Sequence, residues 1–312
     1  MTDAELAELV DAHDSGSCGA SLPGSSPGFR ISRQKGFPFA FFICCAELQN
    51  MLTSRQNPLV KLIRKVHKPK GRQETNLFLL EGTHLLEEAC AVEYSLETVC
   101  ATPEWIENHP QLWDTATKQA SRCEIVNDFV LQALATTIQP DGVVATAKRK
   151  TQNLEESTIS SLIVALETIQ DPGNLGTIIR TAAGAGAGGV WLSDDSADPE
   201  QPKVLRASAG AWFRLPVARK PDLTASVSRC RDNGVQVIAT TAAAQKTYWE
   251  IDYQKPTIIL LGNEGAGLSA SLLKLASHQV QIPLNNGVES LNVAMAAAVI
   301  LYEAQRQQQK RD

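Results

Sequence analysis

Three segments rich in glycine and asparagine decide the fold, and they read Asp171-Pro-Gly-Asn-Leu-Gly-Thr-Ile-Ile-Arg180, Leu261-Gly-Asn-Glu-Gly-Ala-Gly-Leu268 and Ile282-Pro-Leu-Asn-Asn-Gly-Val-Glu-Ser-Leu-Asn-Val293. Each follows an apolar run that contains β-branched residues, and two of the three lead into a helical pattern. In an open α/β sheet, ligands bind at the loops that follow the carboxyl ends of the strands. Three such loops in one domain therefore predict a single ligand site.

Strand and helix patterns alternate from residue 159 to the end of the chain, as βα units with a mainly parallel sheet require. The sequence predicts strands at 162–167, 190–192, 235–239, 257–261 and 279–282, and helices at 175–183, 203–210, 223–233, 270–276 and 291–306. We therefore expect an α/β fold over residues 158–312.

Gly184-Ala-Gly-Ala-Gly-Gly189 matches the spacing of a dinucleotide-binding fingerprint. That fingerprint must follow a strand and open a helix, so that the helix N-terminus faces the pyrophosphate. Here the order is reversed, because these glycines close one helical pattern and precede the strand Val190-Trp-Leu192. They predict a helix end and a tight turn, and they argue against a nicotinamide cofactor.

The first half of the chain predicts a smaller α/β domain at 51–147, joined to the second by a polar linker at 148–157. Its first element is an amphipathic helix at 57–66, followed by a loop at 68–76, a strand at 77–80 and a helix that opens at Glu81. Further strands and helices are expected at 98–101, 105–120 and 142–147. Residues 1–50 read as a flexible extension, and their apolar run at 37–48 is far shorter than the ~20 residues that span a bilayer. A protein that begins near Met51 is an alternative for this region.

The charges are unevenly distributed. The net charge is −5, yet the segment from Arg55 to Arg72 holds seven Lys or Arg residues and no acid. A local basic patch is what binding to a phosphate backbone needs, although a solvated surface helix has the same composition. Seven cysteines without a Cys-x-x-Cys pair favour neither disulfides nor a zinc site. We therefore expect a reducing, cytoplasmic location and no metal.

Polar side chains in the three loops are candidates for chemistry. Asn174 is placed as the N-cap of its helix after a turn at 171–174, and Ser290 as the N-cap of the last helix with Asn292 in its first turn. We expect Glu264 to fix the guanidinium of Arg180 by a bidentate pair. Each of these residues also has a purely structural interpretation.

Taken together, these segments closely resemble the three motifs of the SPOUT superfamily of RNA methyltransferases, in its SpoU/TrmH branch. The resemblance rests on Asn-x-Gly-x-x-x-Arg at 174–180, Gly-Asn-Glu-Gly at 262–265 and Ser-Leu-Asn-Val at 290–293, with Arg206-Ala-Ser-Ala-Gly-Ala211 between the first two. The basic segment through Phe78-Leu-Leu-Glu-Gly82 resembles the ribosomal-protein-like substrate-binding domain that often precedes these motifs.

This resemblance implies S-adenosylmethionine-dependent methylation of a ribose 2′-hydroxyl in RNA, a C-terminal trefoil knot and a homodimer. It assigns the catalytic site to Asn174, Arg180, Glu264, Ser290 and Asn292. The cofactor is then expected at Thr240, Leu261, Gly262, Asn263, Gly265, Ile282, Leu284 and Leu291. RNA is expected at Lys61, Arg64, Lys65, Lys68 and Arg72.

Arg180 is interpreted as an electrostatic clamp on an RNA phosphate or on the developing oxyanion, because the pKa of an arginine lies above about 12. Ribosomal RNA is the first substrate hypothesis and transfer RNA the second. A non-catalytic RNA-binding or ribosome-assembly protein of the same fold is the alternative from another class. The sequence does not specify the modified nucleotide, the role of residues 1–50 or any effect on antibiotic resistance.

Overall fold

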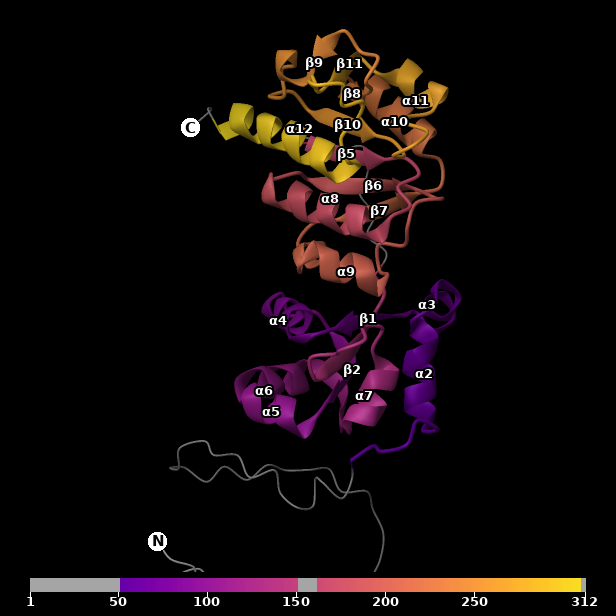
Figure 1. Ribbon diagram of the computed structural model, residues 1–312, viewed down its shortest axis with the longest axis vertical. Coiled ribbons are helices and arrows are strands. Elements are labelled where there is room, and N and C mark those ends of the chain that lie inside the picture. The colour runs from indigo at the N-terminus through magenta and orange to yellow at the C-terminus, as the bar shows by residue number, and fades with distance from the viewer. Residues whose placement is uncertain (1–50, 151–161, 310–312) are drawn as a thin grey trace, which may run out of the picture. The chain divides into compact units, whose positions relative to one another are not determined.

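A computed structural model describes residues 51–150 and 162–309 (Figure 1). The predicted extension at 1–50 and residues 151–157 of the predicted linker lie outside the described residues. Two sheets organise the described chain, one of four strands and one of seven. No helix in these two ranges combines the length and the apolar character needed to cross a membrane.

The four-stranded sheet has the order β1-β4-β2-β3. Central strand β4 is antiparallel to both of its neighbours, whereas β2 and β3 are parallel. Its strands are β1 (Leu77–Glu81), β2 (Leu96–Ala101), β3 (Ala120–Ile125) and β4 (Val143–Lys148). Its helices are α2 (Pro58–Val66), α3 (Pro69–Thr75), α4 (Thr83–Ala91), α5 (Pro103–Asn108), α6 (Pro110–Gln119) and α7 (Asp128–Leu134).

Alternating side chains of β1 divide the core of this sheet between two faces. Leu77 and Leu79 pack with the apolar stripes of α2 and α7, whereas Phe78 and Leu80 pack with α4 and α5. Helix α2 begins as predicted, because the Asn57 side chain accepts a hydrogen bond from the Leu59 N–H at 2.9 Å.

Prolines explain two differences from the predicted elements of this half. The expected loop at 68–76 is helix α3, in which Pro69 occupies the first turn and Asn76 ends the helix with a φ of 54°. Proline at this position lacks only an N–H that would be unpaired anyway. The stretch expected to hold regular structure at 105–120 contains two helices, a division not predicted from the sequence, because a second helix starts at Pro110. Strand β3 and helix α7 were not predicted.

The seven-stranded sheet has the order β7-β6-β5-β10-β8-β11-β9, and all its neighbouring strands pair in parallel. The predicted α/β class with a mainly parallel sheet is thus confirmed. The strands are β5 (Leu162–Leu166), β6 (Gly189–Ser193), β7 (Val217–Lys220), β8 (Gln236–Thr240), β9 (Lys246–Thr247), β10 (Thr257–Leu261) and β11 (His278–Gln281). The two edge strands, β7 and β9, are short and were missed.

Helices cover both faces of the larger sheet (Figure 1). Leu162, Val164 and Leu166 of β5 pack on the side of α8 (Pro172–Gly184), α9 (Pro202–Ser208) and α12 (Val293–Gln308). Ile163 and Ala165 pack on the side of α10 (Leu223–Asp232) and α11 (Ala270–Leu275). Burial on both faces explains why the central strands β5, β8 and β10 read as nearly continuous apolar runs.

The glycines at 184–189 have the structural role that their order predicts. Helix α8 ends at Gly184, Gly186 follows with a φ of 74°, and β6 begins at Gly189. A positive φ is the conformation in which glycine is tolerated best.

The cores of the two sheets are continuous in the described chain, which belongs to one compact unit. The rings of Phe78 in β1 and Trp212 in the 3₁₀ helix η2 (Ala211–Phe213) lie 5.1 Å apart. Ion pairs add to this contact, among them Arg206–Glu81 at 2.6 Å and Arg72–Asp198 at 2.6 Å.

Candidate functional site

The carboxyl ends of four neighbouring strands lie at one edge of the larger sheet. Leu166 of β5 pairs with Leu261 of β10, and Thr240 of β8 pairs with Val280 of β11, while β10 and β8 pair with each other. The segments after these strands are 167–171, 262–269, 241–245 and 282–292. All three loops that the sequence singled out therefore begin at one edge, as expected for a single site.

The Asn174 side chain joins two of these loops. Its Nδ2 donates a hydrogen bond to Glu264 Oε1 at 2.6 Å, and its Oδ1 accepts one from Asn292 Nδ2 at 3.0 Å. Three of the five predicted catalytic residues thus meet through one carboxamide.

Different residues cap the helices of this site than the sequence predicted. Asp171, not Asn174, caps α8, and its Oδ1 accepts from the Asn174 N–H at 2.8 Å. That bond, together with Lys203 at 3.5 Å, holds the pKa of the Asp171 carboxyl below its usual value. Asn292, not Ser290, caps α12, and its Oδ1 accepts from the Ala294 N–H at 2.9 Å. In both places the predicted cap differs from the observed one by two or three positions.

The loop after β10 is held in shape by the side chain of Asn263. Its Nδ2 donates to Thr168 O at 2.9 Å, and its Oδ1 accepts from the N–H groups of Gly265 at 2.9 Å and Ala266 at 3.0 Å. A Cβ on Gly262 would lie 2.3 Å from the backbone of Gly267, so only glycine fits there. The loop thereby presents Glu264 to Asn174.

Arg180 and Ser290 are exposed. The expected pair between Arg180 and Glu264 is absent from the described residues, because Glu264 accepts from Asn174 instead. Arg180 lies six residues beyond Asn174 on α8, about 9 Å farther along the helix axis at ~1.5 Å per residue. In the described part of the chain its side chain has no hydrogen-bond or ion-pair partner, so its guanidinium is available to a ligand.

The predicted cofactor residues lie at the ends of β8, β10 and β11 and in the segment before α12. The Thr240 hydroxyl donates to Leu260 O at 2.9 Å, so this side chain is already used within the sheet. Across 283–291, the described backbone forms one hydrogen bond of its own, from Val288 N to Asn285 O. Unpaired amides and carbonyls beside the aliphatic Ile282 and Leu284 form the kind of surface that binds an adenine ring. These residues therefore fit S-adenosylmethionine.

Helix α2 carries most of the predicted RNA contacts. Lys61, Arg64, Lys65 and Lys68 are exposed. The prediction for Arg72 is wrong, because its side chain is only 1 % exposed and its guanidinium is fully engaged. The pattern of basic residues did not reveal this burial.

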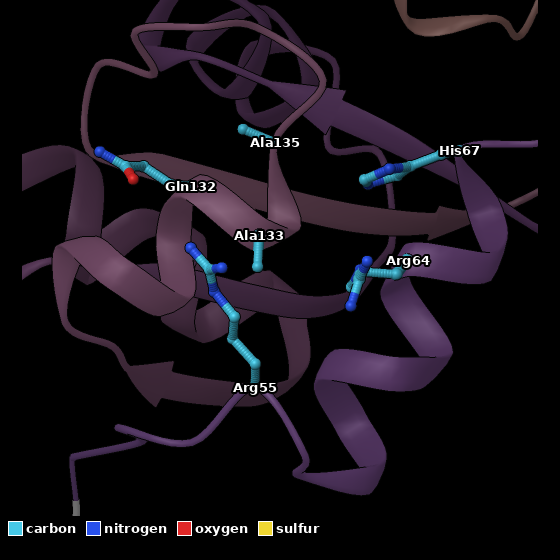
Figure 2. Close-up of a pocket in the computed structure, with 6 residues that line it drawn as sticks. All are labelled: Arg55, Arg64, His67, Gln132, Ala133 and Ala135. Atoms are coloured by element: carbon cyan, nitrogen blue, oxygen red, sulfur yellow. The ribbon is translucent and has the colours of Figure 1, made fainter.

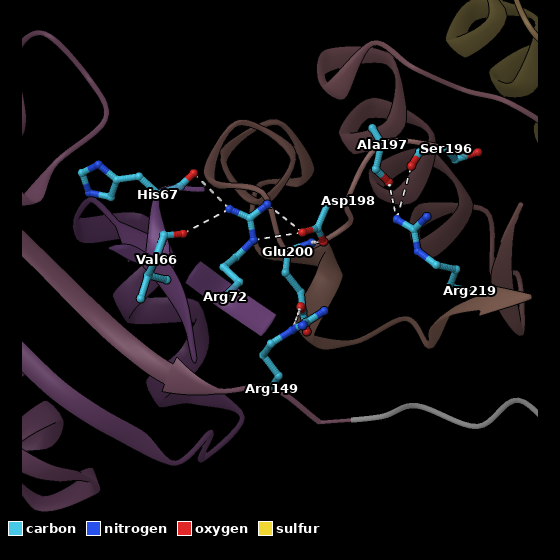
Figure 3. A network of polar contacts seen from close by, with 9 residues as sticks. All are labelled: Val66, His67, Arg72, Arg149, Ser196, Ala197, Asp198, Glu200 and Arg219. Atoms are coloured by element: carbon cyan, nitrogen blue, oxygen red, sulfur yellow. Dashed lines mark hydrogen bonds and ion pairs between the residues drawn. The ribbon is translucent and has the colours of Figure 1, made fainter. Parts of the chain in front are cut away.

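Arg72 instead connects helix α3 to the loop after β6 (Figure 3). Its Nε and Nη2 donate to Asp198 Oδ2 at 2.9 and 2.6 Å, and its Nη1 donates to the carbonyls of Val66 and His67. The neighbouring Ala197 N–H donates to Ile169 O at 2.8 Å. The same loop thus contacts both helix α3 and the segment that leads to Asp171.

A second buried carboxylate ties α9 to the smaller sheet. Glu81 accepts hydrogen bonds from the backbone and hydroxyl groups of Thr136 and Thr137 and from Arg206 Nη1 at 2.6 Å. Arg206 opens the segment Arg206-Ala-Ser-Ala-Gly-Ala211, which carried part of the resemblance. Its observed partner is therefore a carboxylate of this chain.

Known proteins resemble this chain over almost all of the described residues. Residues 161–302 match the SpoU rRNA Methylase family, and residues 57–145 match the MRM3-like substrate binding domain. An uncharacterized tRNA/rRNA methyltransferase of Synechocystis is 48% identical over 257 residues, which are 82% of this chain and 94% of that protein. The 23S rRNA (guanosine(2553)-2′-O)-methyltransferase RlmP of Bacillus subtilis is 34% identical, covering 80% of this chain and 97% of its own.

Solved structures agree with these relatives. The S-adenosylmethionine-bound rRNA methyltransferase of Sinorhizobium meliloti superimposes with a TM-score of 0.74 at 34% identity, covering 82% of this chain and 97% of that one.

Proposed function

Since the chain belongs to the SpoU rRNA methylase family and is an S-adenosylmethionine-dependent RNA ribose 2′-O-methyltransferase, we propose that its substrate is ribosomal RNA. The observation that carries the proposal is the bridge from Glu264 through Asn174 to Asn292, on the helix that also presents an exposed Arg180. The B. subtilis and S. meliloti relatives are both rRNA methyltransferases, which favours ribosomal RNA. Transfer RNA is the second candidate, because the Synechocystis relative is described for either RNA.

We assign the positioning of the ribose to the Asn174 bridge. With both ends of its carboxamide fixed, by Glu264 and Asn292, the side chain has one orientation before RNA arrives. Alignment of a 2′-oxygen with the methyl donor supplies much of the rate in such a reaction. Arg180 is assigned the electrostatic clamp, on an RNA phosphate or on the negative charge that develops on the 2′-oxygen.

The segments after β8, β10 and β11 are proposed to hold the cofactor. When bound, S-adenosylmethionine supplies an electrophilic methyl group on a sulfonium. Backbone groups near Gly262, Ile282 and Leu284 would bind its adenosine portion, and Leu291 would cover it. Thr240, Leu261 and Gly265 would contribute backbone only, and Asn263 would keep the loop in shape.

Helix α12 and the segment before it have exposed apolar side chains, and we propose that they form the interface of a homodimer. Val288 is 54% exposed, Met295 52% and Tyr302 52%, and Leu291 lies between the first two. We assign a second copy of this chain as the occupant, because the patch is continuous with the predicted cofactor segment. Met295→Asp should convert a dimer to a monomer in light scattering, and a wild-type chain that is monomeric would contradict the assignment.

The domain boundaries remain proposals: an RNA substrate-binding domain at 51–147, a linker at 148–157 and a methyltransferase domain at 158–312. The family matches at 57–145 and 161–302 fall inside the two domains and support them. The trefoil knot and a cytoplasmic location are likewise proposed. Cys90, Cys100 and Cys123 are not in disulfides, which suits a reducing compartment.

The direct test is transfer of labelled methyl groups from S-adenosylmethionine to total RNA that lacks this modification. Nuclease digestion and mass spectrometry then identify the nucleoside, after ribosomal and transfer RNA have been separated. A 2′-O-methylated nucleoside in ribosomal RNA that disappears with Arg180→Ala supports the proposal. Methylation confined to transfer RNA would move the assignment to the second candidate. Cofactor binding without transfer to either RNA would favour an assembly factor.

A further inference from the structure

A basic hollow lies on the smaller sheet's side of the molecule, where no motif drew attention (Figure 2). Its volume is about 320 Å³, and its lining comprises Arg55, Arg64, His67, Gln132, Ala133 and Ala135. These residues come from the segment before α2, from the last turn of α2 and the residue after it, and from α7 with the residue after it. The hollow is therefore separate from the loops at the edge of the larger sheet.

Two of its side chains are fixed in advance. Arg55 Nε donates to Phe129 O at 3.1 Å, and the Arg55 guanidinium lies over the Phe129 ring at 3.5 Å from its centroid. The His67 Nε2 lies 2.7 Å from Leu134 O, which holds the imidazole in one orientation. Fixed donors lose little conformational entropy when they bind a ligand.

The remaining polar side chains of the hollow are unsatisfied. Within the described ranges, the side chains of Arg64 and Gln132 have no intramolecular hydrogen bond, and no carboxylate lines the hollow. Figure 2 shows the Arg55 and Arg64 guanidinium groups and the His67 ring directed toward the same space, with Ala133 and Ala135 leaving room. Two guanidinium groups that lack an acidic partner favour an anion, and their planar donors suit the oxygens of a phosphate.

Arg64 also belongs to a surface stripe. Lys61 lies three residues before Arg64 and four before Lys65, so these three residues share one side of α2, and Lys68 follows two residues after the helix ends. The hollow is therefore an extension of the exposed basic stripe, and a polyanion that follows the stripe would reach it. A water molecule occupies about 30 Å³ in the liquid, so the hollow has room for a phosphate together with part of its sugar.

From these contacts we propose that the hollow binds one phosphodiester group of the RNA substrate, with Arg55 and Arg64 as the charged ligands. Gln132 adds an amide donor, and the His67 ring, whose Nε2–H donates to Leu134 O, forms part of the wall. The inference rests on the proposed function, because RNA is the polyanion, and it extends that function to residues outside the predicted RNA contacts. It makes the hollow an anchoring subsite that fixes the register of the RNA on helix α2.

The test measures the affinity of the full-length protein for its substrate RNA over a range of KCl concentrations. Each lost phosphate contact lowers the slope of log K against log salt by about 0.7–0.9. Because the two arginines hold one phosphate, we expect Arg55→Ala with Arg64→Ala to lower the magnitude of the slope by roughly 0.7–0.9. Arg231→Ala, an exposed arginine paired with Asp232 on α10, is the matched control and should leave the slope unchanged.

A second variant adds a charge without removing a contact. Gln132→Glu places a carboxylate in the hollow at an exposed position, and we expect weaker RNA binding in this variant as well. Unchanged affinity and slope in both variants would overturn the proposal. A second outcome would also overturn it. If inorganic phosphate bound the wild-type protein but not the double variant at constant ionic strength, while the salt slope of RNA binding stayed the same, the hollow would be a site for a free anion.

Methyl transfer to RNA by the wild-type protein is measured in a separate assay. A protein that binds RNA through the hollow but methylates none would contradict the proposed function and leave this inference standing.

Discussion

The side chains of Asn174 and Glu264 are joined by a 2.6 Å hydrogen bond although the two residues lie 90 positions apart in the sequence. The bond connects the first turn of α8 to the loop after β10, and Asn292 extends it to the start of α12. Three segments of the larger sheet's ligand edge are thereby held together by one carboxamide.

Removing the Asn174 bridge should reduce methyl transfer far more than stability. In Asn174→Ala, Glu264 and Asn292 each lose a partner, and the oriented polar groups of the site become free to rotate. We expect the single-turnover rate at saturating RNA and cofactor to fall by about 10²–10³-fold, the loss typical of a fixed polar group in an active site. The half-buried position limits the loss of folding stability to about 1 kcal/mol.

Thr181→Ala is the control for this change. Its hydroxyl donates to Thr177 O at 2.8 Å on the same helix and has no link to the site. A rate within threefold of wild type in Asn174→Ala would show that the bridge is dispensable.

Arg180→Lys should lose most of the activity even though the charge is kept. Lysine offers a point charge on a flexible stem, whereas the clamp requires the planar fork of a guanidinium. Because Arg180 is exposed, the substitution should leave the unfolding temperature unchanged. Turnover numbers for the wild-type protein and for the Arg180→Lys and Arg180→Ala variants provide the measurement. Near-normal turnover by the lysine variant would refute the clamp and reduce Arg180 to a source of positive charge.

Sequence patterns predicted the site's location better than its internal bonds. The apolar runs that define β5, β8 and β10 are buried on both faces, so their signal is strong and their carboxyl ends could be placed together. Partners of individual polar side chains depend on tertiary geometry. The Glu264 carboxylate meets Asn174, in the first turn of α8, whereas Arg180 lies six residues farther along the same helix.

The sequence pattern also did not predict which single charged residues are buried. Arg72 belongs to a run of basic residues and has the same composition signal as Lys68, yet it is enclosed by Val66, His67 and Asp198. Its partner is 126 residues away in the chain. The short edge strands β7 and β9 were missed for a related reason, since they have few residues over which an alternating pattern can emerge.

Glu81 should make the protein sensitive to acid. Burial raises the pKa of its carboxyl, but hydrogen bonds from Thr136 and Thr137 and the charge of Arg206 outweigh burial, so the pKa lies below the usual value of 4.5. A carboxyl with a lowered folded-state pKa contributes stability above its unfolded pKa and loses it as the pH falls through the folded value. The free energy of unfolding should therefore decline below about pH 4.5, and less steeply in Glu81→Gln.

The same variant should be destabilised at neutral pH by roughly 3 kcal/mol, because it removes one partner of a buried ion pair. Glu97→Gln is the control, since its pair with Lys148 is on the surface and should contribute no more than about 1 kcal/mol. Urea unfolding from pH 3 to 7 measures both effects. Equal pH slopes for wild type and Glu81→Gln would contradict the assignment.

Gly176→Ala should destabilise the protein through the contact between α8 and α9. A Cβ at this position would lie 2.5 Å from the Ala207 Cβ and 2.6 Å from Val204 O, and a backbone oxygen has little freedom to move. Overfilling a packed contact destabilises a protein by about 1–3 kcal/mol, and separation of the two helices would also strain the Arg206–Glu81 pair on α9. Gly184→Ala is the matched control at the end of the same helix, where the new Cβ would lie 3.4 Å from the Tyr302 hydroxyl and alanine should be neutral or stabilising. Thermal unfolding of the two variants measures the difference. If Gly176→Ala proved as stable as Gly184→Ala, the glycine of the Asn-x-Gly segment would not be required by helix packing and would have to serve the RNA or the cofactor directly.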